Sequence, residues 1–112
     1  MLARANRIVQ ADDYKKVVRR GLRNVSRNTV VYIVHRIDMA GPRFGFIVAK
    51  TVGNAVARNL VRRRLKSVSR SLLDSLPGDT DVVVRALPGS QDTAWTVLRD
   101  EIRESIAKDG RS

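Results

Sequence analysis

The stretch from residue 54 to residue 76 constrains the fold most, because it is the longest helical pattern in the chain. Projected at 100° per residue, its apolar side chains fall within an arc of about 80°; they are Val61, Leu65, Val68, Leu72 and Leu76. Basic and amide side chains fall within an adjacent arc of about 140°; they are Arg58, Asn59, Arg62, Arg63, Lys66 and Arg70. Only Arg64 lies clearly elsewhere, and Pro77-Gly78 ends the pattern. One face of this helix must therefore pack on other elements while a cationic face lies beside it.

The remaining segments predict an α+β domain in which helices pack on a mixed sheet. The expected elements are a helix at 12–20 closed by Gly21, strands at 22–26, 28–37 and 43–50, the helix at 54–76, a strand at 81–86, and a helix at 91–108 with Ser90 as its N-cap. The turn at 38–42 indicates that strands 28–37 and 43–50 form a hairpin. Without a long linker or a repeat, residues 1–112 are expected to form a single domain with loose ends at 1–6 and 109–112.

The charge is unevenly distributed. The chain has 22 Lys and Arg against 11 Asp and Glu, a net charge of +11. Residues 1–70 hold 17 of the basic and 3 of the acidic side chains. A basic surface concentrated in one part of a small fold is typical of a protein that binds polyanions. Nucleic acid is the first candidate and an anionic membrane the second, with a merely solvated basic surface as the alternative.

The side chains offer little for protein-based catalysis. The absence of cysteine excludes disulfides, thiolate zinc sites and a cysteine nucleophile, and the single histidine, His35, disfavours a serine–histidine triad or a multi-histidine metal site. Asp12, Asp13 and Asp38 show no paired spacing for general acid–base work, and residues 50–54 lack the P-loop spacing. We therefore expect no catalytic and no metal-binding residues in the protein. No run approaches a membrane span or a signal peptide, so a soluble cytoplasmic protein is expected.

The stretch RFGFIVAKTVGNAVARNLVRRRLK, residues 43–66, resembles the signature of the bacterial ribonuclease P protein component. The helical part of that signature, R-N-x-x-[KR]-R-x-x-[RK], is matched by Arg58, Asn59, Arg62, Arg63 and Lys66 after Lys50 and Gly53-Asn54. The runs LARANRIVQADDYKKVVRRG and DVVVRALPG are also similar to the family, so the likeness spans residues 2–106. This chain departs from the family pattern where Thr51 replaces a frequent lysine, Tyr14 a common phenylalanine, Val18 a frequent aromatic residue and Lys66 a frequent arginine.

The resemblance implies a fold and a role. The fold is a single-domain α-β-β-β-α-β-α sandwich with a left-handed β-α-β crossover at the long helix, whereas the strand pattern alone predicts the common right-handed one. The role is that of an RNA-binding cofactor protein to a catalytic RNA, which holds Mg²⁺ and removes the 5′ leader of precursor tRNA. The implied partners are the ribonuclease P RNA and precursor tRNA, with no protein partner and no membrane required.

The resemblance also implies two RNA surfaces. The surface for the RNA subunit comprises Lys50, Asn54, Arg58, Asn59, Arg62, Arg63, Lys66 and Arg70. The groove for the single-stranded leader comprises Tyr14, Val18 and Tyr32, although both tyrosines can equally be read as core residues. Two other classes stay open: a non-catalytic structural RNA-binding protein of the ribosomal type, and a nuclease that uses its own side chains.

Overall fold

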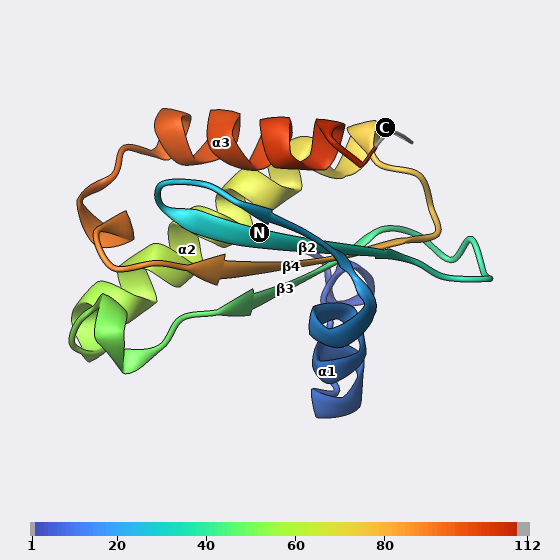
Figure 1. Cartoon of the computed structure of the whole chain (residues 1–112), viewed down its shortest axis with the longest axis horizontal. Helices are drawn as coiled ribbons and strands as arrows, with labels where there is room; N and C mark the ends of the chain where they lie inside the picture. Colours follow the sequence, from blue (N-terminus) through green and yellow to red (C-terminus); the bar gives the residue numbers. More distant parts are fainter. Residues whose placement is uncertain (1, 110–112) are drawn as a thin grey trace.

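The computed structural model describes residues 2–109 and shows one four-stranded sheet with helices on both of its faces (Figure 1). The elements follow the order α1 (Ala11–Arg20), β1 (Leu22–Val25), β2 (Thr29–His35), β3 (Arg43–Ile47), α2 (Ala55–Leu72), β4 (Thr80–Ala86) and α3 (Trp95–Ala107). Short 3-10 turns lie at Arg4–Asn6, Lys50–Val52, Leu73–Ser75 and Ser90–Asp92. Within the described residues, no helix is long and apolar enough to cross a membrane.

The strand order is β1-β2-β4-β3, which corrects the predicted hairpin between strands 28–37 and 43–50. β3 pairs in parallel with β4, with Phe44 opposite Val82, and β4 pairs antiparallel with β2. The reason lies in β4, whose consecutive residues Val82, Val83 and Val84 are fully buried and therefore need neighbours on both edges and cover on both faces. β4 accordingly takes the place between β2 and β3. The connection from β3 through α2 to β4 is left-handed, as the resemblance implies (Figure 1).

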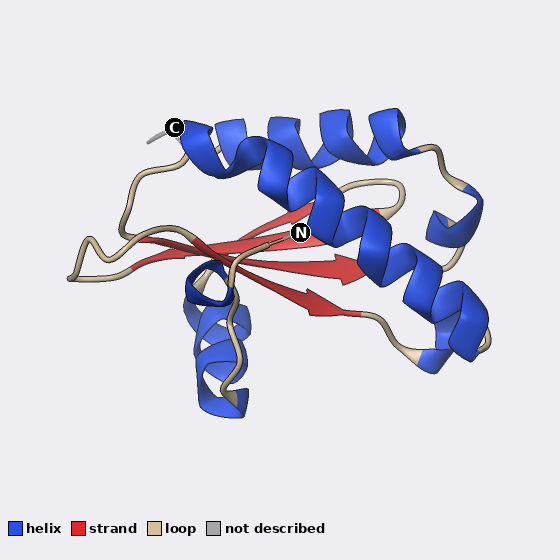
Figure 2. Cartoon of the chain, turned by 180° about the vertical axis from the view of Figure 1, so that it is seen from behind, coloured by secondary structure: helices blue, strands red, loops and turns tan. Residues whose placement is uncertain are grey.

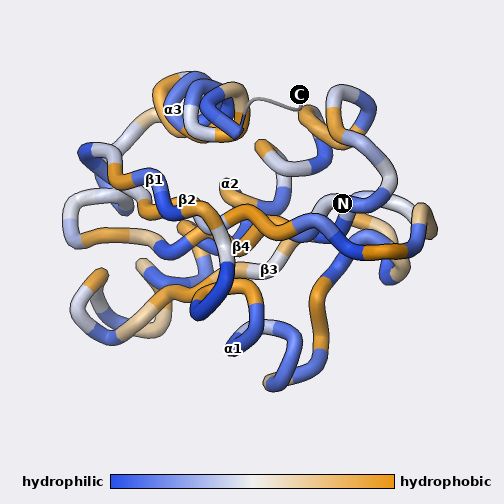
Figure 3. The backbone as a smooth tube through the Cα atoms, turned by 45° about the vertical axis from the view of Figure 1, so that its right-hand side comes forward, coloured by the Kyte–Doolittle hydropathy of each residue, from blue (hydrophilic) through white to orange (hydrophobic). Residues whose placement is uncertain are grey.

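Each face of the sheet has its own apolar core. α2 and α3 cover one face, where Phe44, Leu65 and Leu98 belong to the larger cluster; Figure 2 shows α2 running diagonally across this face. α1 covers part of the opposite face, where Val17 and Tyr32 belong to the smaller cluster. In Figure 3, which colours each residue by its hydropathy, hydrophobic residues are concentrated in the strands between the helices.

The helix boundaries differ from the predicted ones at two places. α2 ends at Leu72, followed by a 3-10 turn, although Leu76 still packs against the larger cluster. α3 begins at Trp95, because residues Ser90–Asp92 form a separate 3-10 turn, so Ser90 is not its N-cap. The Arg64 side chain fixes that turn and the residue after it to α2, since Nη1 donates to the carbonyl oxygens of Gln91 and Thr93 at 3.0 and 3.1 Å. Arg64, which the helical projection placed outside the cationic arc, therefore makes hydrogen bonds within the protein.

The predicted loose ends are ordered where the structure describes them. Leu2 is buried in the larger cluster, and the Asn6 side-chain amide donates to the Pro42 carbonyl oxygen at 2.9 Å. The Ile8 N–H donates to the Phe44 carbonyl oxygen at 2.8 Å, so the N-terminal segment lies along the outer edge of β3. At the other end, Asp109 Oδ2 lies 2.7 Å from His35 Nε2. Residues 1 and 110–112 of the predicted loose ends lie outside the described residues.

Candidate nucleic-acid interface

The cationic helix α2 is positioned by a tight turn after β3. Val52 is buried and anchors this turn, and the next residue, Gly53, has a φ of 156°. A Cβ atom at Gly53 would lie 2.9 Å from the Ala57 Cβ, so the turn requires glycine. Asn54 then caps the helix, because its side-chain oxygen accepts the Ala57 N–H at 2.9 Å. The predicted residues Lys50 and Asn54 are both exposed at this entry, and Asn54 also has a structural function.

α2 brings the predicted RNA-binding residues together on successive turns. Arg62 Nη1 donates to the Asn59 side-chain oxygen at 3.1 Å, and Arg62 Nη2 lies 3.5 Å from the Val48 carbonyl oxygen. Within residues 2–109 none of the α2 cations on this face forms an ion pair with a carboxylate. The Arg58 Nε is buried and also lacks a hydrogen-bond partner among the described residues. We call this surface, formed by Arg58, Asn59, Arg62, Arg63, Lys66 and Arg70, the α2 face.

Other arginines are paired, and they form a separate network at the opposite end of the sheet. The buried carboxylate of Asp81 accepts from Arg43 Nε and Nη2 at 2.9 and 2.8 Å, and it also pairs with Arg36. Arg43 Nη1 lies 3.6 Å from Asp13 of α1. The hydrogen bond to Asp81 raises the pKa of the Arg43 guanidinium above its usual range, so this side chain stays charged. We call this the Asp81 network; it ties together β2, β3, β4 and α1.

Tyr14 of α1 is half-buried and held in place by β3. Its ring lies over Gly45, where a Cβ atom would come within 2.6 Å of a ring carbon. Its hydroxyl accepts the Phe46 N–H at 3.1 Å. The outer part of the ring and Val18 line a hollow of about 310 Å³ together with Lys15 and Arg19, which we call the Tyr14 hollow. Tyr14 therefore belongs both to the packing of α1 and to an open surface with a cationic rim.

Tyr32 does not reach this surface. It is 4% exposed and belongs to the cluster under α1, with Val17 and Val83. Of the two readings that the sequence left open for Tyr32, the structure supports the core residue, because α1 covers the part of the sheet from which its ring projects. Alternation along β2 could not reveal this, since it places a side chain on a face without showing what covers that face.

The sequence analysis missed two residues on the Tyr14 side. Arg85 is the exposed residue of β4, and alternation with Val84 places it on the α1 side of the sheet, opposite Ile47 of β3. The sequence did contain a signal for Arg85, because it is the one cation in the apolar run DVVVRA. Arg7 lies on the edge of β3, and its Nε is buried without a described hydrogen-bond partner. Arg7 shares a cavity of about 190 Å³ with Tyr14 and Lys66. The α2 face and the Tyr14 side of the molecule thus meet along the outer edge of β3.

These surfaces do not suit a magnesium site. Mg²⁺ is held by oxygen ligands, above all carboxylates, whereas the α2 face presents cations and one amide. Among residues 2–109 no group of three or more histidine, aspartate or glutamate side chains is placed to hold a metal ion. Unpaired arginine and lysine instead suit phosphate oxygens, which arginine can bind with two parallel hydrogen bonds. The fold and its unpaired cations define a small basic α+β protein of the nucleic-acid-binding class.

Comparisons with known proteins place the chain more narrowly. The family described as Ribonuclease P matches residues 2–109. The chain is 50% identical over 108 residues to the ribonuclease P protein component of Clavibacter michiganensis subsp. michiganensis, covering 96% of each chain. It is 44% identical to that of Pseudarthrobacter chlorophenolicus, covering 90% of this chain and 74% of the relative. The chain belongs to the ribonuclease P protein family, which confirms the resemblance seen in its sequence.

Solved structures show the same fold. The structure of a Staphylococcus aureus RNase P protein mutant with defective mRNA degradation activity superposes with a TM-score of 0.82 at 25% identity, covering 93% of this chain and 89% of the mutant. The RNase P protein from Thermotoga maritima gives a TM-score of 0.75 at 18% identity, covering 88% and 92% of the two chains. The sandwich is thus retained at low sequence identity.

Proposed function

We propose that this protein is the protein subunit of a ribonuclease P ribonucleoprotein that removes the 5′ leader of precursor tRNA. In this proposal the α2 face binds the catalytic RNA, and the Tyr14 hollow binds the leader of the substrate. The observation that carries the proposal is the α2 face itself: the family motif lies on one helix surface, and its cations have no ion-pair partner in the described protein.

The electrostatics of the α2 face favour RNA as its partner. Cations one helical turn apart repel one another, and phosphates placed against them remove that repulsion while released counterions add to the affinity. Arg62 is already oriented by Asn59, and the buried Arg58 Nε keeps an unused donor. The hydrogen bond to Asn59 lowers the cost of ordering Arg62 against a phosphate backbone. Phosphate contacts of this kind fix position and affinity without reading the base sequence.

The Tyr14 hollow suits an unpaired nucleotide. A base can stack on the exposed part of the Tyr14 ring, with Val18 as an apolar wall one turn along the helix and the cations of Lys15 and Arg19 near the backbone. Arg85, exposed on the same side of the sheet, is a further candidate for a backbone contact. Arg7 and Lys66 line the cavity at the β3 edge. A single-stranded RNA can therefore pass from the α2 face to the Tyr14 hollow along cationic side chains.

The chemistry is proposed to belong to the RNA subunit. Mg²⁺ bound by that RNA supplies the activated water and stabilises the leaving oxygen of phosphodiester hydrolysis. In the described protein, the candidate acid–base group His35 lies 3.3 Å from Asp79 and 2.7 Å from Asp109, away from the α2 face. What this chain contributes is binding: it neutralises phosphates and orients the leader.

Reconstitution tests this proposal and separates it from the two other classes. Purified protein alone should not cleave precursor tRNA, whereas RNA subunit with protein should cleave at a lower Mg²⁺ concentration than RNA alone. The Arg62→Ala/Arg63→Ala variant should lose this effect, and Arg103→Ala, an exposed arginine of α3, should keep it. Binding without any change in the Mg²⁺ requirement would indicate a structural RNA-binding protein. Cleavage by RNA-free protein would indicate a nuclease that uses its own side chains.

A further inference from the structure

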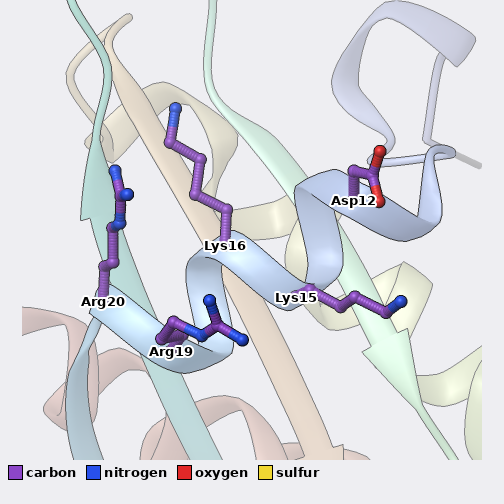
Figure 4. A pocket seen from close by; sticks show the side chains of 5 residues that line it. All are labelled: Asp12, Lys15, Lys16, Arg19 and Arg20. Atoms are coloured by element: carbon purple, nitrogen blue, oxygen red, sulfur yellow. The ribbon is translucent and has the colours of Figure 1, made fainter.

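The outward-facing side of α1 carries a cationic groove that lies apart from the α2 face and shares only Lys15 and Arg19 with the Tyr14 hollow. Lys15 and Arg19 form one row along the helix, and Lys16 and Arg20 form a second row beside it. All four side chains are exposed, and together with Asp12 in the first turn of the helix they line a hollow of about 430 Å³ (Figure 4). In Figure 4 the Lys16 and Arg20 side chains extend in the same direction, whereas those of Lys15 and Arg19 extend in others. We call this surface the α1 groove.

Fold stability does not account for these charges. Within residues 2–109 none of the four forms an ion pair. Asp12 offsets one positive charge at the start of the two rows, but each row still places like charges four residues apart on the helix, an arrangement that destabilises a helix. The helix dipole favours only Arg19 and Arg20, which lie in the last turn. Apolar contacts of α1 come from its other side, through Tyr14, Val17 and Val18.

The α1 groove is continuous with the Tyr14 hollow. Lys15 and Arg19 line both, so the first row of cations is the wall between the two. On the far side, Lys16 and Arg20 border a hollow of about 630 Å³ in which Asp13, Asp38 and Asp81 offset the arginines. Cations without an ion-pair partner in the described chain therefore extend from the β3 edge through the Tyr14 hollow to Lys16 and Arg20, with Asp12 as the one carboxylate among the residues that line the α1 groove.

We propose that the α1 groove binds the sugar–phosphate backbone of the distal leader, meaning the leader nucleotides beyond those in the Tyr14 hollow. This rests on the proposed function, in which the leader enters the Tyr14 hollow from the side of the α2 face. A leader RNA that leaves the Tyr14 hollow over Lys15 and Arg19 meets cations spaced about 6 Å apart along the helix. Beyond these cations it meets arginines that are offset by carboxylates. Recognition through phosphates alone makes this contact independent of leader sequence.

The test compares precursor tRNAs whose leaders are lengthened one nucleotide at a time, bound to the reconstituted holoenzyme. The test variant is Lys16→Ala/Arg20→Ala, because these residues do not line the Tyr14 hollow. The matched control is Arg103→Ala/Lys108→Ala, which removes two exposed cations at the end of α3. The charge-preserving variant Lys16→Arg/Arg20→Lys should behave as the unmodified protein, and thermal melting should show that all variants are folded.

We expect the test variant to bind leaderless and short-leader precursors normally and long-leader precursors more weakly, by a factor on the order of ten. For long leaders, the slope of log affinity against log salt should decrease by about 1.4, as expected when a single strand loses two phosphate contacts. An equal loss at every leader length, or no loss at any, would overturn the proposal. The proposed function fails separately if the unmodified protein neither lowers the Mg²⁺ requirement nor improves binding of any leader.

Discussion

The Asp81 network and the α2 face use the same side chain for opposite purposes. In the network, Arg36 and Arg43 meet a carboxylate that is 5% exposed, so their charges are neutralised and three strands are tied to one another. On the α2 face, Arg58, Arg62 and Arg63 have no carboxylate partner in the described protein. The difference teaches that net charge alone does not locate an RNA surface. The informative quantity is the set of cations that the fold leaves unpaired.

The strongest way to break this comparison is to remove the carboxylate of the network. Asp81→Ala leaves two arginines without their counter-charge beneath the β2–β3 loop, so the free energy of unfolding should fall by about 3 kcal/mol. Urea denaturation measures this change. Asp100→Ala, which removes an exposed partner of Arg99 and Arg103, should cost less than about 1 kcal/mol. Equal costs for the two variants would mean that the network is no more than a surface ion pair.

Tyr14 both packs against the sheet and lines the hollow proposed to bind RNA, so its substitution should change stability and affinity together. Tyr14→Ala should remove most of the leader-dependent affinity, about 1–3 kcal/mol, and should also lower stability by about 2 kcal/mol because the ring packs over Gly45. The affinity ratio between leader-bearing and leaderless precursor tRNA, measured on the folded holoenzyme, separates these effects. If the ratio survives in a folded variant, the leader does not stack on Tyr14.

Tyr14→Phe is the matched control. The ring face remains, so the leader-dependent ratio should be kept. The Phe46 N–H loses its acceptor, so stability should fall by about 1 kcal/mol. A large loss of the ratio with Tyr14→Phe would show that the hydroxyl contacts RNA or that its bond to Phe46 is needed to orient the ring.

Single substitutions on the α2 face should separate affinity from stability. Arg58→Ala, Arg62→Ala or Arg63→Ala should each weaken assembly with the RNA subunit by about 1.5 kcal/mol, because each loses a charge-assisted contact to phosphate. Melting should barely change, and the salt dependence of assembly should become shallower by about one counterion per residue. RNA titration and thermal melting on the same samples measure both. A sharp fall in melting temperature with intact affinity would make these arginines structural.

Arg64 follows Arg63 directly in the chain but lies outside the α2 face. Its substitution should therefore have the smallest effect on assembly with RNA. Arg64→Ala removes the donor that holds the carbonyl oxygens of Gln91 and Thr93, so stability should fall by about 1 kcal/mol. Assembly with RNA should change by less than about 0.5 kcal/mol, since a surface change away from the contact is nearly neutral. If Arg64→Ala weakens assembly as much as Arg63→Ala does, the RNA contact is not confined to the α2 face.

The sequence by itself determined the features that depend on near neighbours along the chain. Helical periodicity separated the apolar stripe around Val61 and Leu65 from the cationic arc and excluded Arg64, and the structure confirms both assignments. The family signature lies within residues 43–66, so it was also readable without any tertiary information, and the family comparison confirms it. Periodicity and motif are properties of residues a few positions apart, and each turn of a helix brings such residues together.

Only the tertiary structure decided which side chains are free to meet a partner. Local pattern favoured a hairpin of β2 with β3, yet the burial of β4 on both faces places that strand between them. The coverage of Tyr32 by α1 and the pairing of Arg36 with Asp81, 45 positions along the chain, depend on segments that are distant in the sequence. Burial and pairing of this kind follow from how whole elements pack, and no local spacing of residues encodes them.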